Sequence, residues 1–136
     1  MRDFIITSLQ TWDIEIGSTI KNTALEISKQ NRVLYINTPM DISIRLRGDR
    51  QSPSYIRRMA VIKGETSPLR QINANMWILD CPFTVLSANF LPASLFNIVN
   101  RKNHARIARW IVEQATALGF KNYIHLMIQT FTAAAI

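Results

Sequence analysis

The chain has 136 residues, of which 48% are hydrophobic, 18% charged and 9% aromatic, a composition that suits a packed core and excludes a disordered chain. With only 4 Gly, 5 Pro and no apolar run near the roughly 20 residues that span a bilayer, it also excludes collagen-like, low-complexity and simple transmembrane proteins. The first residues lack the pattern of a cleaved signal peptide. We therefore expect one small domain located in the cytoplasm.

The charge and the few cysteines and histidines limit the chemistry further. Sixteen Lys and Arg against nine Asp and Glu give a formal charge of +7, which favours phosphorylated ligands, an anionic membrane face or nucleic acid as partners. Cys81 is the only cysteine, and His104 and His125 are the only histidines. An internal disulfide and a cysteine metal cluster are thus excluded, and no zinc-site spacing is present. We expect neither a metal nor a cofactor.

The first part of the chain predicts a strand, a helix and a second strand. Residues 4–9 form a short apolar run, and a helical pattern follows from Ser18, a good capping residue, to about residues 30–31. A second apolar run at 32–37 is rich in β-branched and aromatic residues and is terminated by Pro39. This order normally implies two parallel strands joined by a right-handed crossover.

The pattern breaks down between residues 40 and 71, where arginines alternate with scattered apolar residues, and we expect a long basic excursion with at most a short helix around 54–59. Residues 75–80 again look like a strand. A helical pattern starts at Pro92, either as one long element or as two broken near Asn100, and Gly119 is a natural helix end.

A last strand at about 121–126 completes the order strand, helix, strand, excursion, strand, helix, strand. This order predicts an α/β fold in which a mostly parallel sheet is layered with helices. Such sheets bind ligands at the carboxyl ends of their strands. We find no repeat and no linker that would divide the chain.

The segment 8–18 joins the first strand to the first helix and therefore lies at the predicted ligand edge. A helix start offers free N–H groups to an anion, Gly17 permits close approach, and Trp12 can stack on a sugar or another ring. Asp13 or Glu15 can accept a hydroxyl proton or bind hydroxyls. The alternative is that Trp12 only packs the loop and the carboxylates only solvate the turn. No dinucleotide-binding GxGxxG pattern is present.

The basic excursion suggests contact with lipid phosphates or phosphorylated acceptors, because guanidinium groups bind phosphate oxygens in pairs and nearby apolar residues can enter a membrane interface. The arginines concerned are Arg45, Arg47, Arg50, Arg57 and Arg58. The alternative is a solvated, partly disordered loop. Residues 101–109 carry a second basic stretch, most simply an exposed helix face, and both histidines and Cys81 are most simply structural.

One resemblance covers the chain continuously from Asp3 to His125. SLQTWDIEIGS at residues 8–18, followed by matching residues at 21–22 and 24–26 and by NRVLYINTP at 31–39, resembles the start of bacterial glycosyltransferases with the two-domain glycosyltransferase-B fold. Such enzymes pair two Rossmann-like domains across a cleft. The first mainly holds the acceptor, and the second holds most of the nucleotide-sugar, usually without a metal ion.

The resemblance implies that residues 1–125 are the acceptor-side domain of an enzyme that transfers a sugar from a nucleotide-sugar to a polysaccharide or lipid-linked glycan acceptor. Alone, such a domain should be inactive. It would work in the cytoplasm, at the inner face of the membrane. The substrate-binding residues of the cleft-facing loop would then be Gln10, Trp12, Asp13, Gly17 and Ser18, with Asp13 as the candidate for catalysis.

The resemblance also bears on the last residues. Members of the family are considerably longer, and related chains continue after the last strand with a Phe-Asn-Asp-Ser-Asp-type segment, which residues 126–136 do not match. One inserted nucleotide after an inferred His125 codon restores that segment. We therefore expect residues 126–136 to be a frameshifted or non-native tail, which sequencing of the coding DNA would check.

Two other functions remain open on the sequence alone. A small basic nucleic-acid-binding module would use the charge of +7 and stacking Trp and Tyr residues, but no RNP-like, KH or helix-turn-helix signature is present. A peripheral membrane-binding module is compatible with sugar transfer. An electrophoretic shift assay and liposome sedimentation would separate these alternatives.

Overall fold

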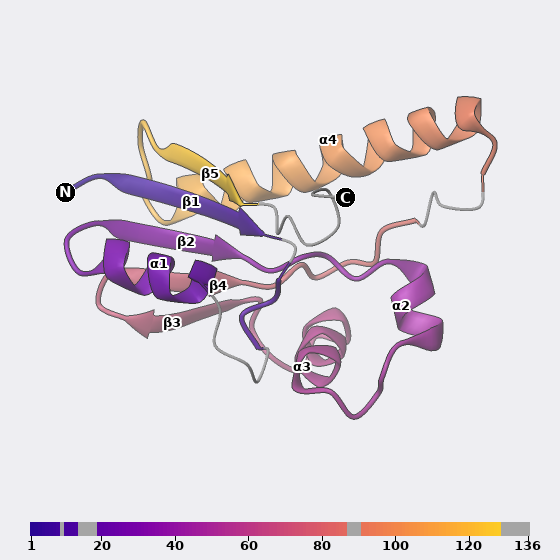
Figure 1. The fold of residues 1–136 in the computed structure, drawn as a ribbon, viewed down its shortest axis with the longest axis horizontal. Helices are drawn as coiled ribbons and strands as arrows, with labels where there is room; N and C mark the ends of the chain where they lie inside the picture. The colour runs from indigo at the N-terminus through magenta and orange to yellow at the C-terminus, as the bar shows by residue number, and fades with distance from the viewer. Residues whose placement is uncertain (9, 14–18, 87–90, 129–136) are drawn as a thin grey trace.

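The computed structural model describes residues 1–8, 10–13, 19–86 and 91–128 (Figure 1). Its elements, in chain order, are β1 Asp3–Ser8, α1 Thr19–Ser28, β2 Arg32–Ile36, α2 Ile42–Arg47, α3 Pro53–Ile62, β3 Leu69–Asn73, β4 Met76–Leu79, α4 Ala93–Ala117 and β5 Ile124–Ile128. In the described part of the chain, no helix has the length and apolar character needed to cross a membrane.

The strands form one five-stranded sheet in the order β3-β4-β2-β1-β5. β1, β2, β4 and β5 run parallel, and β3 pairs antiparallel with β4 at one edge. The predicted α/β class with a mostly parallel sheet is thus confirmed. The step from β1 to β2 and the step from β4 to β5 cross the sheet in opposite directions. Because parallel crossovers keep one handedness, α1 and α4 are expected on opposite faces.

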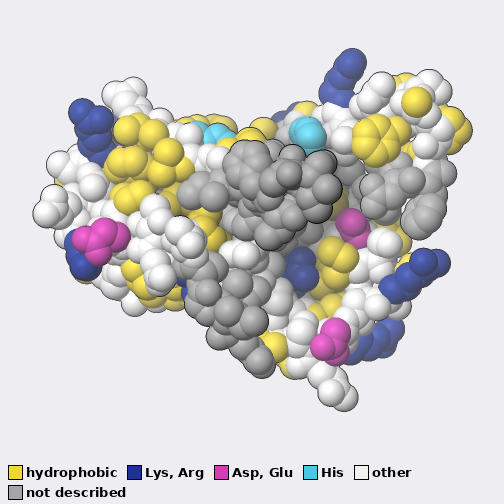
Figure 2. Space-filling view, viewed as in Figure 1, with side chains coloured by type: hydrophobic (Ala, Val, Ile, Leu, Met, Phe, Trp, Pro, Cys, Tyr) yellow, Lys and Arg dark blue, Asp and Glu magenta, His cyan; other side chains and the backbone are white. Residues whose placement is uncertain are grey.

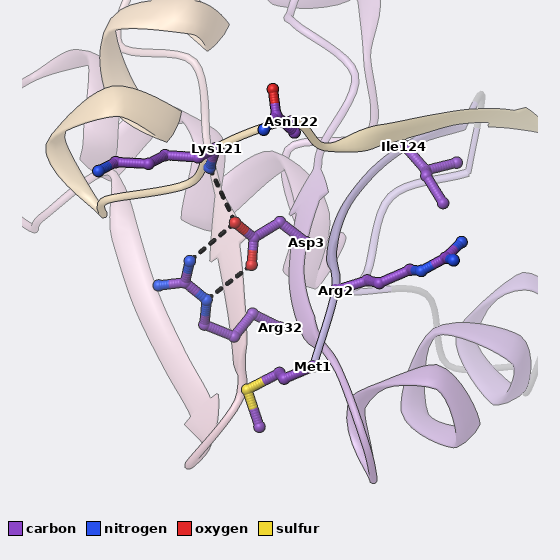
Figure 3. A pocket seen from close by; sticks show the side chains of 7 residues that line it. All are labelled: Met1, Arg2, Asp3, Arg32, Lys121, Asn122 and Ile124. Carbon is purple, nitrogen blue, oxygen red and sulfur yellow. Dashed lines mark hydrogen bonds and ion pairs between the residues drawn. The ribbon is translucent and has the colours of Figure 1, made fainter.

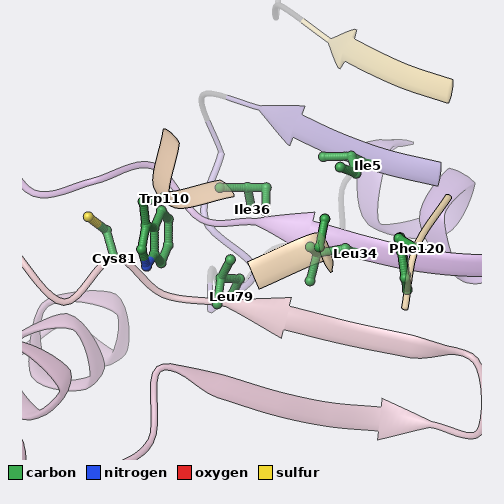
Figure 4. Packing of buried hydrophobic residues seen from close by; sticks show 8 residues of the cluster. Ile5, Leu34, Ile36, Leu79, Cys81, Trp110 and Phe120 are labelled. Carbon is green, nitrogen blue, oxygen red and sulfur yellow. The ribbon is translucent and has the colours of Figure 1, made fainter. Parts of the chain in front are cut away.

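The two faces of the sheet carry separate apolar clusters, as the alternation of side chains along a strand requires. Val33 and Tyr35 of β2 face α1, where they pack with Ile20 and Ala24. Leu34 and Ile36 of the same strand face α4. The cluster on that side is shown in Figure 4 and contains Ile5, Leu34, Ile36, Leu79, Cys81, Trp110, Ala115 and Phe120.

Helix α4 is continuous through Asn100, so of the two arrangements left open by the sequence the single long helix is correct. Its buried residues, Trp110 and Ala115, lie in its second half, and its first half extends past the end of the sheet (Figure 1). The helix is followed by Gly119, whose φ of 76° is accessible mainly to glycine. There the Phe120 N–H donates to the carbonyl of Ala115 at 2.9 Å, which closes a Schellman motif.

The basic excursion at 40–71 is more ordered than predicted, because it holds α2, α3 and β3 in place of one short helix. Asp41 caps α2 by accepting from the Ile44 N–H at 2.7 Å, and Ser52 caps α3 just before Pro53. Helix α2 has only six residues, too few to show a helical period in the sequence. The capping residues were the available signal.

Strand β5 continues past the predicted boundary at residue 125. It pairs with β1 through Leu126, Met127 and Ile128, opposite Ile6, Thr7 and Ser8. The boundary and the frameshifted tail stay predictions, and residues 129–136 lie outside the described residues.

Candidate functional site

Two fully buried polar residues follow neighbouring strands at the carboxyl edge of the sheet. Asn37 comes directly after β2 and Asp80 directly after β4, and both have 0% exposure. Because β2 and β4 are parallel neighbours, their ends meet, and the Asn37 amide Nδ2 donates to Asp80 Oδ1 at 2.6 Å. A buried carboxylate is stable only with such partners. This contact joins the ends of β2 and β4 at the centre of the site.

The loop after β1 is fastened to β2. Asn37 Oδ1 accepts from the Trp12 N–H at 2.7 Å, and the Tyr35 hydroxyl donates to the Gln10 carbonyl at 2.8 Å. Burial raises the pKa of Tyr35 above its ordinary value, although a hydrogen bond with Ser8 opposes the shift. The phenol therefore stays protonated and keeps its donor role. The sequence analysis predicted this loop at the carboxyl edge of the sheet, and the structure holds residues 10–13 there.

Arginines from α3 and β3 complete the cluster. Arg70 forms a bidentate ion pair with Asp13, at 2.9 Å for both contacts, and lies 3.7 Å from Asp80. Arg57 Nε donates to Asp80 at 3.1 Å, while its other nitrogens bind Thr66 and Ser67. Asp13, Asn37, Arg57, Arg70 and Asp80 thus form one network, which we call the carboxyl-edge cluster. It joins the β1 loop, β2, β3, β4 and α3.

Arg58 lies beside this cluster with little direct pairing. Its Nη1 donates to the Thr38 carbonyl at 3.3 Å. Burial lowers the pKa of Arg58 below its ordinary value, and the nearby carboxylates of Asp80, Asp41 and Asp13 oppose the shift. Within the described residues, Arg58 Nε, Arg70 Nε and Gln10 Oε1 are buried without a hydrogen-bond partner. Buried polar atoms without a hydrogen-bond partner are rare in folded proteins.

A cavity of about 260 Å³ opens next to the cluster, at the carboxyl ends of β1, β2 and β5. This is the point where the strand order reverses, because β2 lies on one side of β1 and β5 on the other. Open α/β sheets bind ligands at such a reversal. The walls combine polar and apolar side chains: Thr7, Ser8, Ile36, Asn37, Thr38, Pro39, His104, Ile107, Ile111 and Met127.

Hydrogen bonds fix the polar wall of this cavity. Thr38 Oγ1 donates to the Ser8 carbonyl at 2.8 Å, and Thr7 Oγ1 lies 2.9 Å from His125 Nε2. His104 enters from α4 and also lines an adjoining cavity of about 320 Å³ that extends toward α2. The two histidines, which the sequence analysis assigned to structural roles, therefore lie at or beside a cavity.

The sequence-predicted loop residues have distinct surroundings. Trp12 packs edge-on against Tyr35 with ring centroids 5.4 Å apart, and Lys21 Nζ lies 4.8 Å from the centre of its ring. Trp12 thus shows the packing contacts of the alternative interpretation, while the Asp13 carboxylate is held by Arg70. Substrate binding by Gln10, Trp12 and Asp13 stays a prediction. Gly17 and Ser18 lie outside the described residues.

The predicted phosphate-binding arginines divide into two groups. Arg57 and Arg58 turn into the carboxyl edge, where they contact Asp80, Thr66, Ser67 and Thr38. Arg45, Arg47 and Arg50 are exposed on and just after α2. The proposed contact of these five residues with lipid or phosphate stays a prediction. Of the five, Arg45, Arg47 and Arg50 are exposed and can reach a lipid or phosphate group at the surface.

Asn37, Arg70 and Asp80 were missed as site residues. A polar residue directly after a buried strand was the available signal for Asn37 and Asp80. Arg70 was grouped with the basic excursion, and its place on β3 depends on an antiparallel pairing that the sequence did not reveal.

A third cavity, of about 630 Å³, lies at the opposite, amino edge of the sheet (Figure 3). There Asp3 accepts two bonds of 2.7 Å from Arg32 and one of 2.8 Å from the Lys121 N–H. Burial opposes ionisation of Asp3, but these hydrogen bonds outweigh it, and the pKa of Asp3 lies below its ordinary value. The side chains of Arg2 and Lys121 point away from this carboxylate (Figure 3). We call the contacts of Asp3 with Arg32 and with the Lys121 N–H the amino-edge clasp, and we interpret this clasp as structural.

The fold and the site define an α/β domain with a polar cluster and a cavity at the carboxyl ends of its parallel strands. Comparison of the chain with known family models, with curated proteins and with solved structures gives no match.

Proposed function

We propose that the chain is the acceptor-side domain of a sugar-transferring enzyme, the Rossmann-like N-terminal half of a glycosyltransferase-B fold. The observation that carries the proposal is the cavity of about 260 Å³ at the strand reversal. Its hydroxyl and imidazole groups from Thr7, Thr38 and His104 face apolar side chains from α4 and β5. A sugar ring presents the same combination of hydroxyl groups and an apolar face, and the volume is near the lower end of small-molecule sites, about 300 Å³.

The carboxyl-edge cluster has a positioning role in this proposal. Both oxygens of the Asp13 carboxylate accept hydrogen bonds from Arg70, and catalysis by Asp13 stays a prediction. By holding Asp13 and the Trp12 N–H, Arg70 and Asn37 fix the loop that follows β1, and Asn37 also lines the cavity. A preorganised loop lowers the ordering cost of binding a flexible glycan.

The proposal gives donor binding to a second domain, as in the family that the sequence resembles. Transfer needs the donor pyrophosphate and the charge developing on the sugar to be stabilised while an acceptor hydroxyl loses its proton. One wall of a cleft cannot hold both reactants in line. We therefore expect the 136-residue chain to bind an acceptor saccharide weakly and to show no turnover.

Saturation-transfer NMR tests this proposal with a panel of neutral oligosaccharides and with UDP- and GDP-sugars. Irradiation of protein methyl groups should transfer saturation to at least one oligosaccharide. Ile107→Trp, which fills the cavity, should abolish that transfer. Val112→Trp is the matched control, because Val112 lies on the same helix at 48% exposure and does not line the cavity.

Three results would contradict the proposal. They are the absence of saturation transfer to every oligosaccharide, equal transfer in Ile107→Trp and in the control, and sustained turnover of a nucleotide-sugar by the chain alone.

A further inference from the structure

Exposed positive charge gathers on and just after α2 and along α4 as far as Arg109. The exposed basic residues of segments 42–56 and 91–112 are Arg45, Arg47, Arg50, Arg101, Lys102, Arg106 and Arg109. The exposed acidic residues in and next to these segments are Asp49 and Glu113. The seven basic and two acidic residues leave an excess of five positive charges, compared with +7 for the whole chain. We call this surface the basic end.

The same end exposes most of the large apolar side chains. Of the thirteen exposed large hydrophobic residues in the described part of the chain, eight lie in or beside these segments: Ile42, Leu46, Ile56, Leu86, Leu91, Leu95, Ile98 and Val112. Figure 2 shows hydrophobic side chains gathered over the start of α4, with Lys and Arg side chains over α2 at the same end. Leu46, at 69% exposure, lies between two arginines.

Helix α4 arranges both kinds of side chain on one stripe. Leu95, Ile98, Lys102, Arg109 and Val112 recur at intervals of three, four and seven residues, so they share one helix face. A different face of the same helix, which includes Phe96 and Asn103, lines the cavity toward α2. The stripe therefore lies on the outer surface, and its long basic side chains can extend past the apolar ones to reach charged groups.

We propose that the basic end docks on the surface of a membrane that contains anionic lipid. Interfacial helices combine apolar residues, which enter the boundary between headgroups and acyl chains, with Lys and Arg, which bind lipid phosphates. Nucleic acid fits this surface less well, because single strands bind by stacking on exposed aromatic rings, whereas the eight exposed residues are all aliphatic.

This inference is independent of sugar transfer, because it concerns α2 and the outer face of α4 and its test uses no sugar. It also differs from the sequence prediction in its residues. Arg57 and Arg58 turn inward to the carboxyl edge, and the outer stripe of α4 takes their place in the membrane contact.

Vesicle sedimentation tests the inference with the full 136-residue chain. The chain should bind vesicles of phosphatidylcholine that contain phosphatidylglycerol, should not bind pure phosphatidylcholine, and should bind less as salt rises. The triple variant R45Q/R47Q/R50Q should lower the partition coefficient about a hundred-fold, because each basic residue near the surface contributes about five-fold.

Two further variants make the test specific. R2Q/K29Q/K121Q removes the same charge from exposed residues at the opposite end and should change binding less than about five-fold. L46S/L95S/I98S leaves the charge unchanged but should also reduce binding, and circular dichroism should show that all variants are folded. No binding to anionic vesicles, or equal losses in the two charge variants, would overturn the inference. Duplex DNA binding that is insensitive to L46S/L95S/I98S, in a chain that does not bind vesicles, would assign the surface to nucleic acid.

Discussion

The amino and carboxyl edges of the sheet share one construction and differ in what is added to it. At each edge an arginine pairs with a buried aspartate and also reaches the turn that follows a helix. At the amino edge Arg32 binds Asp3 and the Gly119 carbonyl at 3.0 Å. At the carboxyl edge Arg57 binds Asp80 and the Ser67 carbonyl at 2.6 Å.

The difference lies in the surplus of polar groups. The Asp3 carboxylate is satisfied by Arg32 and by the Lys121 N–H, and the clasp needs nothing more. The carboxyl edge adds a second carboxylate, two further guanidinium groups and an amide. It also holds three of the four buried side-chain atoms that lack a hydrogen-bond partner among the described residues. One ion pair is thus enough to hold the amino edge together. The additional polar groups lie at the carboxyl edge, where α/β sheets bind ligands.

Removing the central carboxylate of the carboxyl edge should have the largest effect. Asp80→Ala leaves Arg57, Asn37 and part of Arg70 without their partner in a site with no exposure. Breaking a buried pair from one side costs about 3–5 kcal/mol. We expect a loss of this size in the free energy of unfolding, measured by urea denaturation.

Glu113→Gln, on the exposed surface of α4, is the control and should stay within about 0.5 kcal/mol of the parent chain. Cys81, next to Asp80, reports on the edge directly. Burial raises the pKa of its thiol to about 11, with the nearby backbone and Arg106 opposing the shift, so alkylation of the folded chain should be slow. An Asp80→Ala chain with unchanged stability and unchanged Cys81 labelling would show that the cluster is not coupled to the fold.

At the amino edge, Asp3→Asn should cost about 2 kcal/mol near neutral pH, because it weakens charged hydrogen bonds in a partly exposed pair. The effect should depend on pH in a defined direction. The pKa of Asp3 is lowered in the folded chain, so its stabilisation is complete above the ordinary carboxyl pKa of about 3.9 and is lost as pH falls through the folded value. Urea denaturation at a series of pH values measures the difference between the two chains.

The stability curves of the parent chain and Asp3→Asn should therefore converge at acid pH. A difference that stays constant from neutral pH to pH values below the ordinary carboxyl pKa would show that the clasp acts through shape and not through charge. Cys81 labelling should respond less to Asp3→Asn than to Asp80→Ala, since the two residues lie at opposite edges.

Replacing the glycine in the turn that leads to each edge should reduce stability by a similar amount. Gly119 and Gly64 both end a helix with positive φ, 76° and 74°, and neither has a neighbouring atom that a methyl group would meet. Alanine at either position should cost about 1–2 kcal/mol through backbone strain alone. Thermal unfolding of the two variants measures this. A clearly larger loss at Gly119 would indicate that the strain also disturbs the carbonyl bound by Arg32.

Much of the sheet could be predicted from the sequence, because each parallel strand is a continuous apolar run and each helix on its faces has a helical period. The runs at 4–9, 32–37 and 75–80 correspond to β1, β2 and β4, and the helical patterns to α1 and α4. The place of the loop after β1 at the carboxyl edge followed from the strand-to-helix order alone, and the structure describes Gln10, Trp12 and Asp13 there, while ligand binding at this edge stays a prediction.

The rest depends on pairing between distant segments. The contact of Asn37 with Asp80 requires β4 to lie beside β2, and the contact of Asp13 with Arg70 joins residues 57 positions apart across an antiparallel edge strand. No local pattern specifies such contacts. Arg57 and Arg45 have the same residue type in the same basic stretch, yet burial against Asp80 gives one of them a structural partner while the other stays on the surface.

The smallest expected effect concerns the ion pair of Asp13 with Arg70, which the carboxyl edge has in addition to the pair of Arg57 with Asp80. A double-mutant cycle with Asp13→Asn and Arg70→Gln should give a coupling of about 1 kcal/mol, because the pair is bidentate and its side chains are only 15% and 26% exposed. The pair of Glu26 and Lys29 is the matched control. Its 2.6 Å contact is shorter, but its side chains are 72% and 68% exposed, so its coupling should be at most about 0.5 kcal/mol. If the two cycles gave equal values, solvent would screen both pairs alike, and the loop after β1 would not be held in place by Arg70.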